Sequence, residues 1–179
     1  HSLVYGQMIQ KIGRRMAEHY AGANEAAIKE YERLIREKGI DCDFARCPAY
    51  LYSRDEETLL RQEAEAAKSL GIEASFETDC ELPFSVAGVT KFAHQAKFHP
   101  LRFLAKMAEE VEVYEQTKVL KVEGRRVETG RGCVTAEHIV FAAHFPFINI
   151  PGYYFARMYQ ERSYVVALEG TERPEGMYL

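Results

Sequence analysis

The sequence lacks several features that common classes of protein need. No apolar run is long enough to span a bilayer, and no signal peptide is recognisable. The formal net charge of −4 gives no basic excess for a nucleic-acid surface, so we expect no nucleic-acid partner. Among the four cysteines only Cys42 and Cys47 lie close together, and one such pair is a weak metal signal. We therefore expect no metal, and we predict reduced thiols in a cytoplasmic protein.

The composition, by contrast, is that of a folded domain. Hydrophobic residues make up 47% of the 179 residues, which is enough for a packed core. The chain begins HSLVYG without a methionine and stops at RPEGMYL. Neither end resembles a natural terminus, so we expect an internal fragment of a longer protein.

Three stretches have the periodicity of helices. Apolar residues recur at three- and four-residue spacing over 3–38, which predicts two helices or one long bent helix that ends at Gly39. Ser53 and Glu56 have the spacing of a capping box and predict a helix over about 55–70. The sequence FHPLRFLAKMAEE predicts a third helix that starts at Pro100, with His99 as its cap.

The remaining apolar stretches read as strands. Short strands are predicted at 49–52 and 72–78, and an alternating one at 86–96. Glycine turns separate predicted strands at 111–116, 118–124 and 125–131, and further strands are predicted at 133–143 and 153–170. The order of elements predicts an α+β fold (mixed α/β), with helices packed on a mixed sheet.

The predicted strand 133–143 ends in small residues, Ala142 and Ala143, before His144. A strand that only fills a core usually ends in a polar turn, whereas small residues suit a place where a ligand approaches the backbone. The preceding hairpin carries Thr117 and Val119, and then the spacing V-x-T-x-x-G over 127–132. This unit resembles the later half of the flavin domain in two-dinucleotide-type FAD oxidoreductases. His144 departs from it, because the family usually has glycine there, and Ala143 stands in a threonine place.

A second match extends the resemblance over almost the whole chain. The sequences FHPLR (98–102) and AAHFPF (142–147) are similar to a bacterial branch of the D-amino-acid-oxidase-like (DAO) family of FAD-dependent oxidoreductases. Some members of that branch carry a Rieske domain. The resemblance implies a substrate-binding lobe over 1–110, a flavin-domain meander and strand over 111–147, and a return into the substrate lobe over 148–179.

The resemblance also implies cofactors, a reaction and site residues. FAD is the implied cofactor and an amine or amino acid the implied substrate, oxidised by hydride transfer to flavin. The resemblance leaves two electron acceptors open, oxygen or a Rieske 2Fe-2S cluster in a missing domain. The implied FAD-binding residues are Val119 through its backbone, Ala142, Ala143 and His144. His1 and Ser2 are implied to lie beside the flavin. The candidate substrate-binding residues are Gln95, Arg157, Arg162 and Tyr164, of which the arginines can pair with a carboxylate.

Each of these assignments has an alternative, and no catalytic residue is assigned. His144 is as well explained as a loop residue, Gln95 as an exposed polar residue, and the arginines as surface residues. The family cradles pyrophosphate with a G-x-G-x-x-G turn, which this chain lacks, so we expect the chain alone to hold FAD weakly or not at all. A cofactor-free α+β binding domain and, less favoured, a metal enzyme that uses His94 and His99 are the rival hypotheses. Unpaired edges predict self-association of the fragment.

Overall fold

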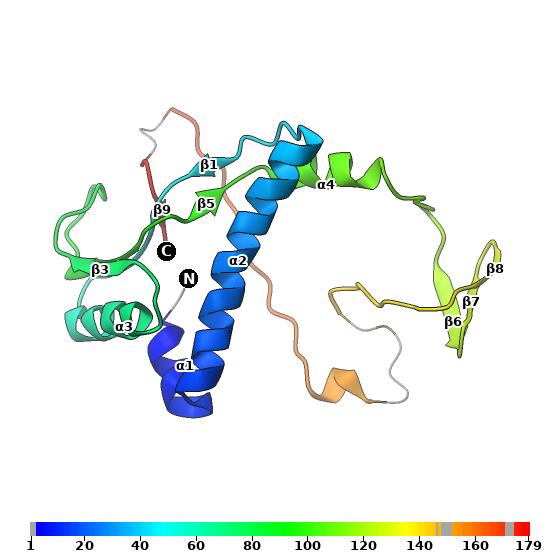
Figure 1. Cartoon of the computed structure of the whole chain (residues 1–179), viewed down its shortest axis with the longest axis horizontal. Coiled ribbons are helices and arrows are strands. Elements are labelled where there is room, and N and C mark those ends of the chain that lie inside the picture. The colour runs from blue at the N-terminus through cyan, green and yellow to red at the C-terminus, as the bar shows by residue number, and fades with distance from the viewer. Residues whose placement is uncertain (1–2, 146, 148–151, 171–173) are drawn as a thin grey trace. The chain divides into compact units, whose positions relative to one another are not determined.

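The computed structural model describes residues 3–145, 147, 152–170 and 174–179 (Figure 1). The chain forms two compact units. Unit 1 comprises His1–Val111 together with Glu172–Leu179, and unit 2 comprises Glu112–Thr171. The predicted position of His1 and Ser2 and the predicted turns at Pro146 and Pro151 lie outside the described residues.

Two consecutive helices begin unit 1. Helix α1 covers Tyr5–Ile12 and helix α2 covers Arg14–Lys38. Gly13 separates them with φ of 86°, a conformation that favours glycine, so the prediction of two helices is confirmed. Helix α2 ends as predicted at Gly39, which adopts the left-handed conformation and donates its amide to the last turn.

The other two helices begin after predicted capping residues. Helix α3 covers Glu57–Ser69, and the Ser53 hydroxyl accepts the amide of Glu56 at 3.2 Å in the turn that precedes it. Ser53 therefore shapes the turn, but the helix itself starts later than the capping-box spacing predicted. Helix α4 covers Pro100–Ala108, and His99 caps it by accepting the amide of Arg102 on Nδ1 at 3.4 Å.

A mixed four-stranded sheet forms the centre of unit 1. Its strands are β2 (Ala49–Ser53), β3 (Ala74–Glu77), β4 (Gly88–Phe92) and β9 (Met177–Tyr178), in the order β3-β4-β2-β9. Strand β4 pairs antiparallel with both β2 and β3, whereas β9 runs parallel to β2. A separate ribbon pairs β1 (Ala45–Arg46) with β5 (Ala96–Lys97). His94 has φ of 57° and divides the predicted strand 86–96 into β4 and β5.

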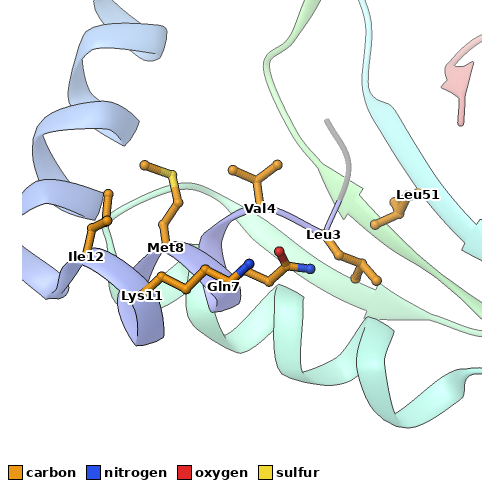
Figure 2. A pocket seen from close by; sticks show the side chains of 7 residues that line it. All are labelled: Leu3, Val4, Gln7, Met8, Lys11, Ile12 and Leu51. Carbon is orange, nitrogen blue, oxygen red and sulfur yellow. The ribbon is translucent and has the colours of Figure 1, made fainter. Parts of the chain in front are cut away.

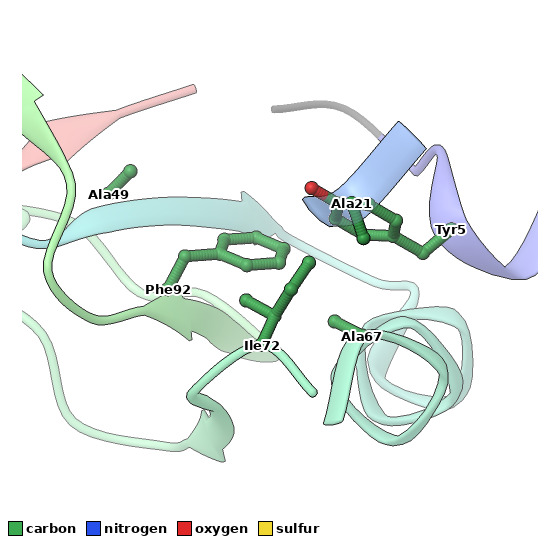
Figure 3. Packing of buried hydrophobic residues seen from close by; sticks show 6 residues of the cluster. All are labelled: Tyr5, Ala21, Ala49, Ala67, Ile72 and Phe92. Atoms are coloured by element: carbon green, nitrogen blue, oxygen red, sulfur yellow. The ribbon is translucent and has the colours of Figure 1, made fainter. Parts of the chain in front are cut away.

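The main core of unit 1 lies where the helices meet this sheet. Figure 3 shows Tyr5, Ala21 and Ala67 from the three helices α1, α2 and α3 near Phe92 and Ala49 of the sheet, with Ile72 between them. The rings of Tyr5 and Phe92 lie 6.1 Å apart. The hydroxyl of Thr90 donates to the carbonyl of Leu60 at 2.7 Å, so α3 is also tied to the sheet by a buried hydrogen bond. A second buried cluster joins the end of α2 to α4 through Ile40, Cys42 and Phe103.

Unit 2 contains a three-stranded antiparallel meander. Strands β6 (Val119–Glu123), β7 (Arg126–Thr129) and β8 (Gly132–Thr135) follow one another in the sheet. The predicted turns at Gly124 and at 130–132 are confirmed, and a short 3-10 helix follows at Tyr154–Ala156. The helices, the mixed sheet and this meander confirm the predicted mixed α+β class.

Two strand predictions in this half of the chain were wrong, and a third was right only over its first residues. Residues 111–116 form no strand, the last meander strand stops at Thr135, and the described part of 153–170 has no strand. A strand needs a partner for its backbone hydrogen bonds. Within the described residues no strand pairs with 111–116, 137–143 or 153–170, so their apolar sequence alone does not make them strands.

Candidate functional site

The first turn of α1 is fixed by a carboxylate from another helix. No side chain at the N-cap position of α1 accepts its free amides. Instead Glu63 of α3 accepts three of them: Oε1 from the amides of Val4 at 2.8 Å and Tyr5 at 2.7 Å, and Oε2 from Gly6 at 2.9 Å. Glu63 is only 3% exposed. A negative charge is favourable at a helix N-terminus, so Glu63 completes the start of α1.

Gly6 gives this carboxylate the room it needs. A Cβ atom at position 6 would lie 3.2 Å from Oε2 of Glu63, closer than ordinary van der Waals contact. A larger residue at this position would therefore require the Glu63 carboxylate to shift by a few tenths of an ångström.

A pocket of about 510 Å³ lies along α1. Figure 2 shows Gln7 and Lys11 on α1 beside Met8 and Ile12, with Leu51 on the neighbouring strand β2. Leu3 and Val4, which precede the helix, complete the lining. Ligand pockets typically combine apolar walls with a few polar groups. This one offers an amide and an ammonium group, which suit an organic molecule that carries a carbonyl or a negative charge.

A second hollow of about 420 Å³ lies between α1 and α3. Leu3 and Gln7 line it as well as the first pocket, and Glu63 forms part of its wall. The two hollows thus share the residues on either side of the amides that Glu63 holds.

The predicted substrate residue Gln95 lies elsewhere in unit 1. It follows β4 and is 4% exposed, so the alternative of an exposed polar residue is wrong. Its Nε2 donates to Oε1 of Glu25 at 3.2 Å and to the carbonyl of Ala93 at 3.1 Å. Gln95 lines a smaller hollow of about 270 Å³ together with aromatic side chains of Tyr31, Phe44 and Phe98.

The other predicted substrate residues belong to unit 2. Arg157 follows the 3-10 helix, and Arg162 and Tyr164 lie in the irregular segment after it. All three are exposed. Among the described residues, no hydrogen bond or ion pair joins their side chains to another group. The structure therefore does not gather these three residues into a formed carboxylate site within unit 2.

The predicted FAD-binding residues of unit 2 lie in different kinds of secondary structure. Val119 begins β6, which is an edge strand of the meander. The carbonyl of Lys118 accepts the amide of Gly130 at 3.2 Å, so Lys118 directs its backbone towards β7. Because neighbouring residues in a strand alternate, Val119 directs its amide and carbonyl towards the open edge. Ala142, Ala143 and His144 are exposed in an irregular segment.

The histidines named in the metal hypothesis have other partners. Nε2 of His94 lies 3.0 Å from a carboxylate oxygen of Glu73, and His99 caps α4. Within the part of the chain that the structure describes, no group of three or more His, Cys, Asp or Glu residues could hold a metal ion. Within the same part, no helix has the length and apolarity to cross a membrane.

Sequence reasoning did not identify Glu63, Gln7 or Lys11. Glu63 has a recognisable signal: it is a carboxylate in the apolar stripe of α3, between Leu60 and Ala67, which are both buried. A charged residue in such a stripe needs a partner inside the protein. Gln7 and Lys11 carry no comparable signal, because polar residues on a helix are usually solvent-exposed.

Comparison with known proteins identifies the family. The family model described as FAD dependent oxidoreductase (DAO) matches residues 3–178, nearly the whole chain. This chain belongs to the DAO family of FAD-dependent oxidoreductases. The resemblance drawn from the meander and the FHPLR and AAHFPF sequences is thereby confirmed.

Two individual proteins extend this finding. The chain is 35% identical over 191 residues to a Bacillus subtilis protein, YhfW, whose name describes a Rieske 2Fe-2S iron-sulfur protein. The match covers 100% of this chain and 38% of YhfW. The chain therefore spans well under half of that relative's length. Among solved structures, L-proline dehydrogenase from P. horikoshii matches with a TM-score of 0.52 and 13% identity, over 62% of this chain and 34% of that one. This second likeness concerns the fold.

The residues present fit FAD at one end only. Val119 offers backbone groups at an open strand edge, and the small side chains of Ala142 and Ala143 leave room for a ligand near the backbone. The glycine-rich turn that would hold the pyrophosphate is not in these 179 residues. The chain thus has candidates for the adenine end and none for the phosphates.

Proposed function

We propose that the protein acts as an FAD-dependent oxidoreductase that oxidises an amine or an amino acid by hydride transfer to flavin. The family match over residues 3–178 is the observation that carries the proposal. In such enzymes the flavin accepts the hydride, while the protein binds and orients the substrate carbon and excludes water. We assign residues 1–110 and 148–179 to the substrate lobe and 111–147 to the flavin domain.

We assign the adenine end of FAD to unit 2. The open-edge amide and carbonyl of Val119 are suited to hydrogen bonds with a base, and the exposed Ala142 and Ala143 are suited to close approach. His144 follows them and would lie beside the cofactor. Because the pyrophosphate turn is absent from this chain, we expect tight FAD binding only in a protein that supplies one.

We assign substrate binding to Gln95, Arg157, Arg162 and Tyr164. Two arginines offer bidentate pairing to a substrate carboxylate, which is the support for an amino acid over a simple amine. The pocket beside α1 adds Lys11 as a third cationic candidate. Replacement of Arg157 or Arg162 by Lys keeps the charge and removes the bidentate geometry, so it separates recognition of a carboxylate from a general charge effect.

We further propose that electrons pass to a Rieske 2Fe-2S cluster in another domain. The name of YhfW supports this, since that relative is more than twice as long as the part this chain matches. A cytoplasmic location is proposed with it, because all four cysteines are free thiols.

Anaerobic reduction of the full-length protein tests the proposed reaction. The purified flavoprotein would be mixed with glycine, N-methylglycine, L-proline and D-alanine, and with matched amines that lack the carboxylate. We expect the oxidised flavin band to bleach with at least one amino acid, and Arg157→Lys or Arg162→Lys to raise the concentration required. No bleaching with any of these amino acids or amines would contradict the proposed substrate class, whereas a protein that purifies without flavin and takes up none would favour the cofactor-free binding domain.

Self-association of the 179-residue chain is proposed through the stretch 162–169. Its apolar residues are among the most exposed in the chain, at 87% for Tyr164 and 92% for Val165. Antiparallel pairing with a second copy, with Val165 opposite Val166, would place Arg162 opposite Glu169 at both ends. An exposed apolar segment with unpaired backbone is a ready template for such pairing.

Light scattering at high concentration tests this pairing. We expect a dimer that Val165→Lys converts to a monomer, whereas Val140→Lys, at another exposed valine, leaves the dimer intact. A monomeric wild-type chain at high concentration would contradict the proposal.

A further inference from the structure

Two of the three amides that Glu63 holds, those of Val4 and Gly6, belong to residues that line one or the other of two hollows. Val4 lines the pocket beside β2, Gly6 lines the hollow between α1 and α3, and Leu3 and Gln7 line both. Any shift of the first turn of α1 would therefore move both walls together. One buried side chain, on a different helix, sets that position.

The contact needs a carboxylate and not merely an acceptor. Both oxygens are used, since Oε1 accepts from Val4 and Tyr5 while Oε2 accepts from Gly6. A glutamine at position 63 would offer one oxygen and one NH₂ group, so at least one amide would face a donor. Within the described residues no Lys, Arg or His side chain forms an ion pair with Glu63. The three amides and the helix dipole thus stabilise its charge.

We propose that the pocket beside α1 forms part of the substrate site, and that Glu63 is a positioning residue for this pocket. It fixes the first turn of α1 and thereby places Leu3, Val4 and Gln7 against Leu51. This inference rests on the proposed oxidoreductase function for its substrate, but the fixation itself rests on the contacts of Glu63 alone. Small displacements of a binding wall have large effects on substrate use, about 10²-fold for a misplacement near 1 Å.

Hydrogen exchange in the full-length protein tests the fixation without any substrate. In the Glu63→Gln variant we expect the amides of Val4, Tyr5 and Gly6 to lose protection by about 10-fold or more, while amides of β4 keep theirs. Glu65→Gln is the matched control, because Glu65 is an exposed glutamate on the same helix. Protection that persists at residues 4–6 in Glu63→Gln would overturn the inference.

Steady-state kinetics test the positioning role separately. With whichever of glycine, N-methylglycine, L-proline or D-alanine reduces the flavin, we expect Glu63→Gln to raise KM by about 10-fold with a smaller change in kcat, since a displaced wall weakens ground-state and transition-state binding alike. If KM is unchanged although the amides of residues 4–6 lose protection, Glu63 only caps α1. That result would overturn its role in positioning the pocket. A protein that purifies without flavin would contradict the proposed oxidoreductase function, and with it the role of Glu63 in substrate binding. The hydrogen-exchange result would still show whether Glu63 fixes the first turn of α1.

Discussion

Unit 1 and unit 2 bury their apolar residues to very different extents. All the buried hydrophobic side chains among the described residues lie in unit 1, from Tyr5 to Phe103. In unit 2 even strand residues are open, with Leu120 at 63% and Val134 at 56% exposure. Unit 1 therefore has its own core, whereas the meander of unit 2 has regular hydrogen bonds without one.

Hydrogen bonds between strands do not by themselves make a small sheet stable on its own. A small sheet needs a hydrophobic face packed on something else. Unit 2 exposes apolar side chains that packing of this kind would cover. We expect unit 1 to fold cooperatively and unit 2 to be the weaker of the two.

Core truncation gives the largest expected contrast between the units. Phe92→Ala removes a ring that is fully buried against Tyr5, and we expect it to lower the free energy of unfolding by about 3–5 kcal/mol. Val134→Ala on β8 should change it by less than about 0.5 kcal/mol, because that side chain is exposed. Urea unfolding followed by circular dichroism measures both. Equal effects would show that unit 2 has a core after all.

The next prediction concerns the stability of unit 1 at alkaline pH, through the ionisation of Tyr5. Burial, with smaller contributions from Tyr20, Glu25 and Glu63, raises the pKa of Tyr5 to about 12. An unfolded tyrosine titrates near 10, so the neutral phenol favours the folded state. This stabilisation is complete below about pH 10 and is lost as pH rises towards 12, by about 2–3 kcal/mol for a two-unit shift.

Tyr5→Phe isolates this contribution. The variant keeps the ring but has no group to ionise, so its free energy of unfolding should fall less steeply between pH 10 and 12 than that of the wild type. Denaturant titrations at several pH values measure the slope. Parallel curves for the two proteins would show that Tyr5 does not couple ionisation to the folding of unit 1.

Two glycines that begin strands provide a matched pair. Gly88 starts β4 with φ of 154°, and Gly132 starts β8 with φ of 145°. A Cβ at Gly88 would come within 2.5 Å of the Phe76 ring, whereas none of the atoms around Gly132 lies within 4 Å of such a Cβ. We expect Gly132→Ala to cost about 1 kcal/mol for backbone strain and Gly88→Ala about 1–2 kcal/mol more for crowding. Thermal unfolding measures the difference, and equal costs would mean that Phe76 moves aside freely.

Surface ion pairs give the smallest expected effects, in both units. Arg33 lies between Glu30 and Glu37 on α2, and Arg126 lies 3.5 Å from Glu128 in the meander. All of these groups are solvent-exposed, so water and salt screen them. Arg33→Ala and Arg126→Ala should leave the thermal midpoint nearly unchanged. A clear loss in either would reveal a contact beyond the exposed pair.

The same contrast explains what the sequence could predict. Helix periodicity over 3–38 and the glycine at 39 predicted the helical stretch of α1 and α2 and its end, because these signals are local. The stretch 153–170 has the residues of a strand but forms none, since strand formation depends on a partner elsewhere. Glu63 was missed for a similar reason. Its role depends on the amides of residues 4–6, almost 60 positions away.

For the candidate site, the sequence could indicate the setting of a residue only where that setting depends on its own backbone. Val119 was predicted from the family pattern, and the alternation of β6 is consistent with an open-edge backbone there. Gln95 was predicted on a strand, but it lies buried after the turn at His94. The substrate-binding roles of the exposed residues Arg157, Arg162 and Tyr164 stay predictions. A site for a carboxylate needs several groups brought together in space, and the sequence does not specify that arrangement.

The visible absorption spectrum of the full-length protein, purified without added cofactor, tests the central claim most directly. Flavin bands that bleach anaerobically with an amino acid would support an FAD oxidoreductase, and additional iron–sulfur absorption would support the Rieske electron acceptor. A folded, colourless protein that takes up no FAD when it is added would contradict the proposed function as an FAD-dependent oxidoreductase.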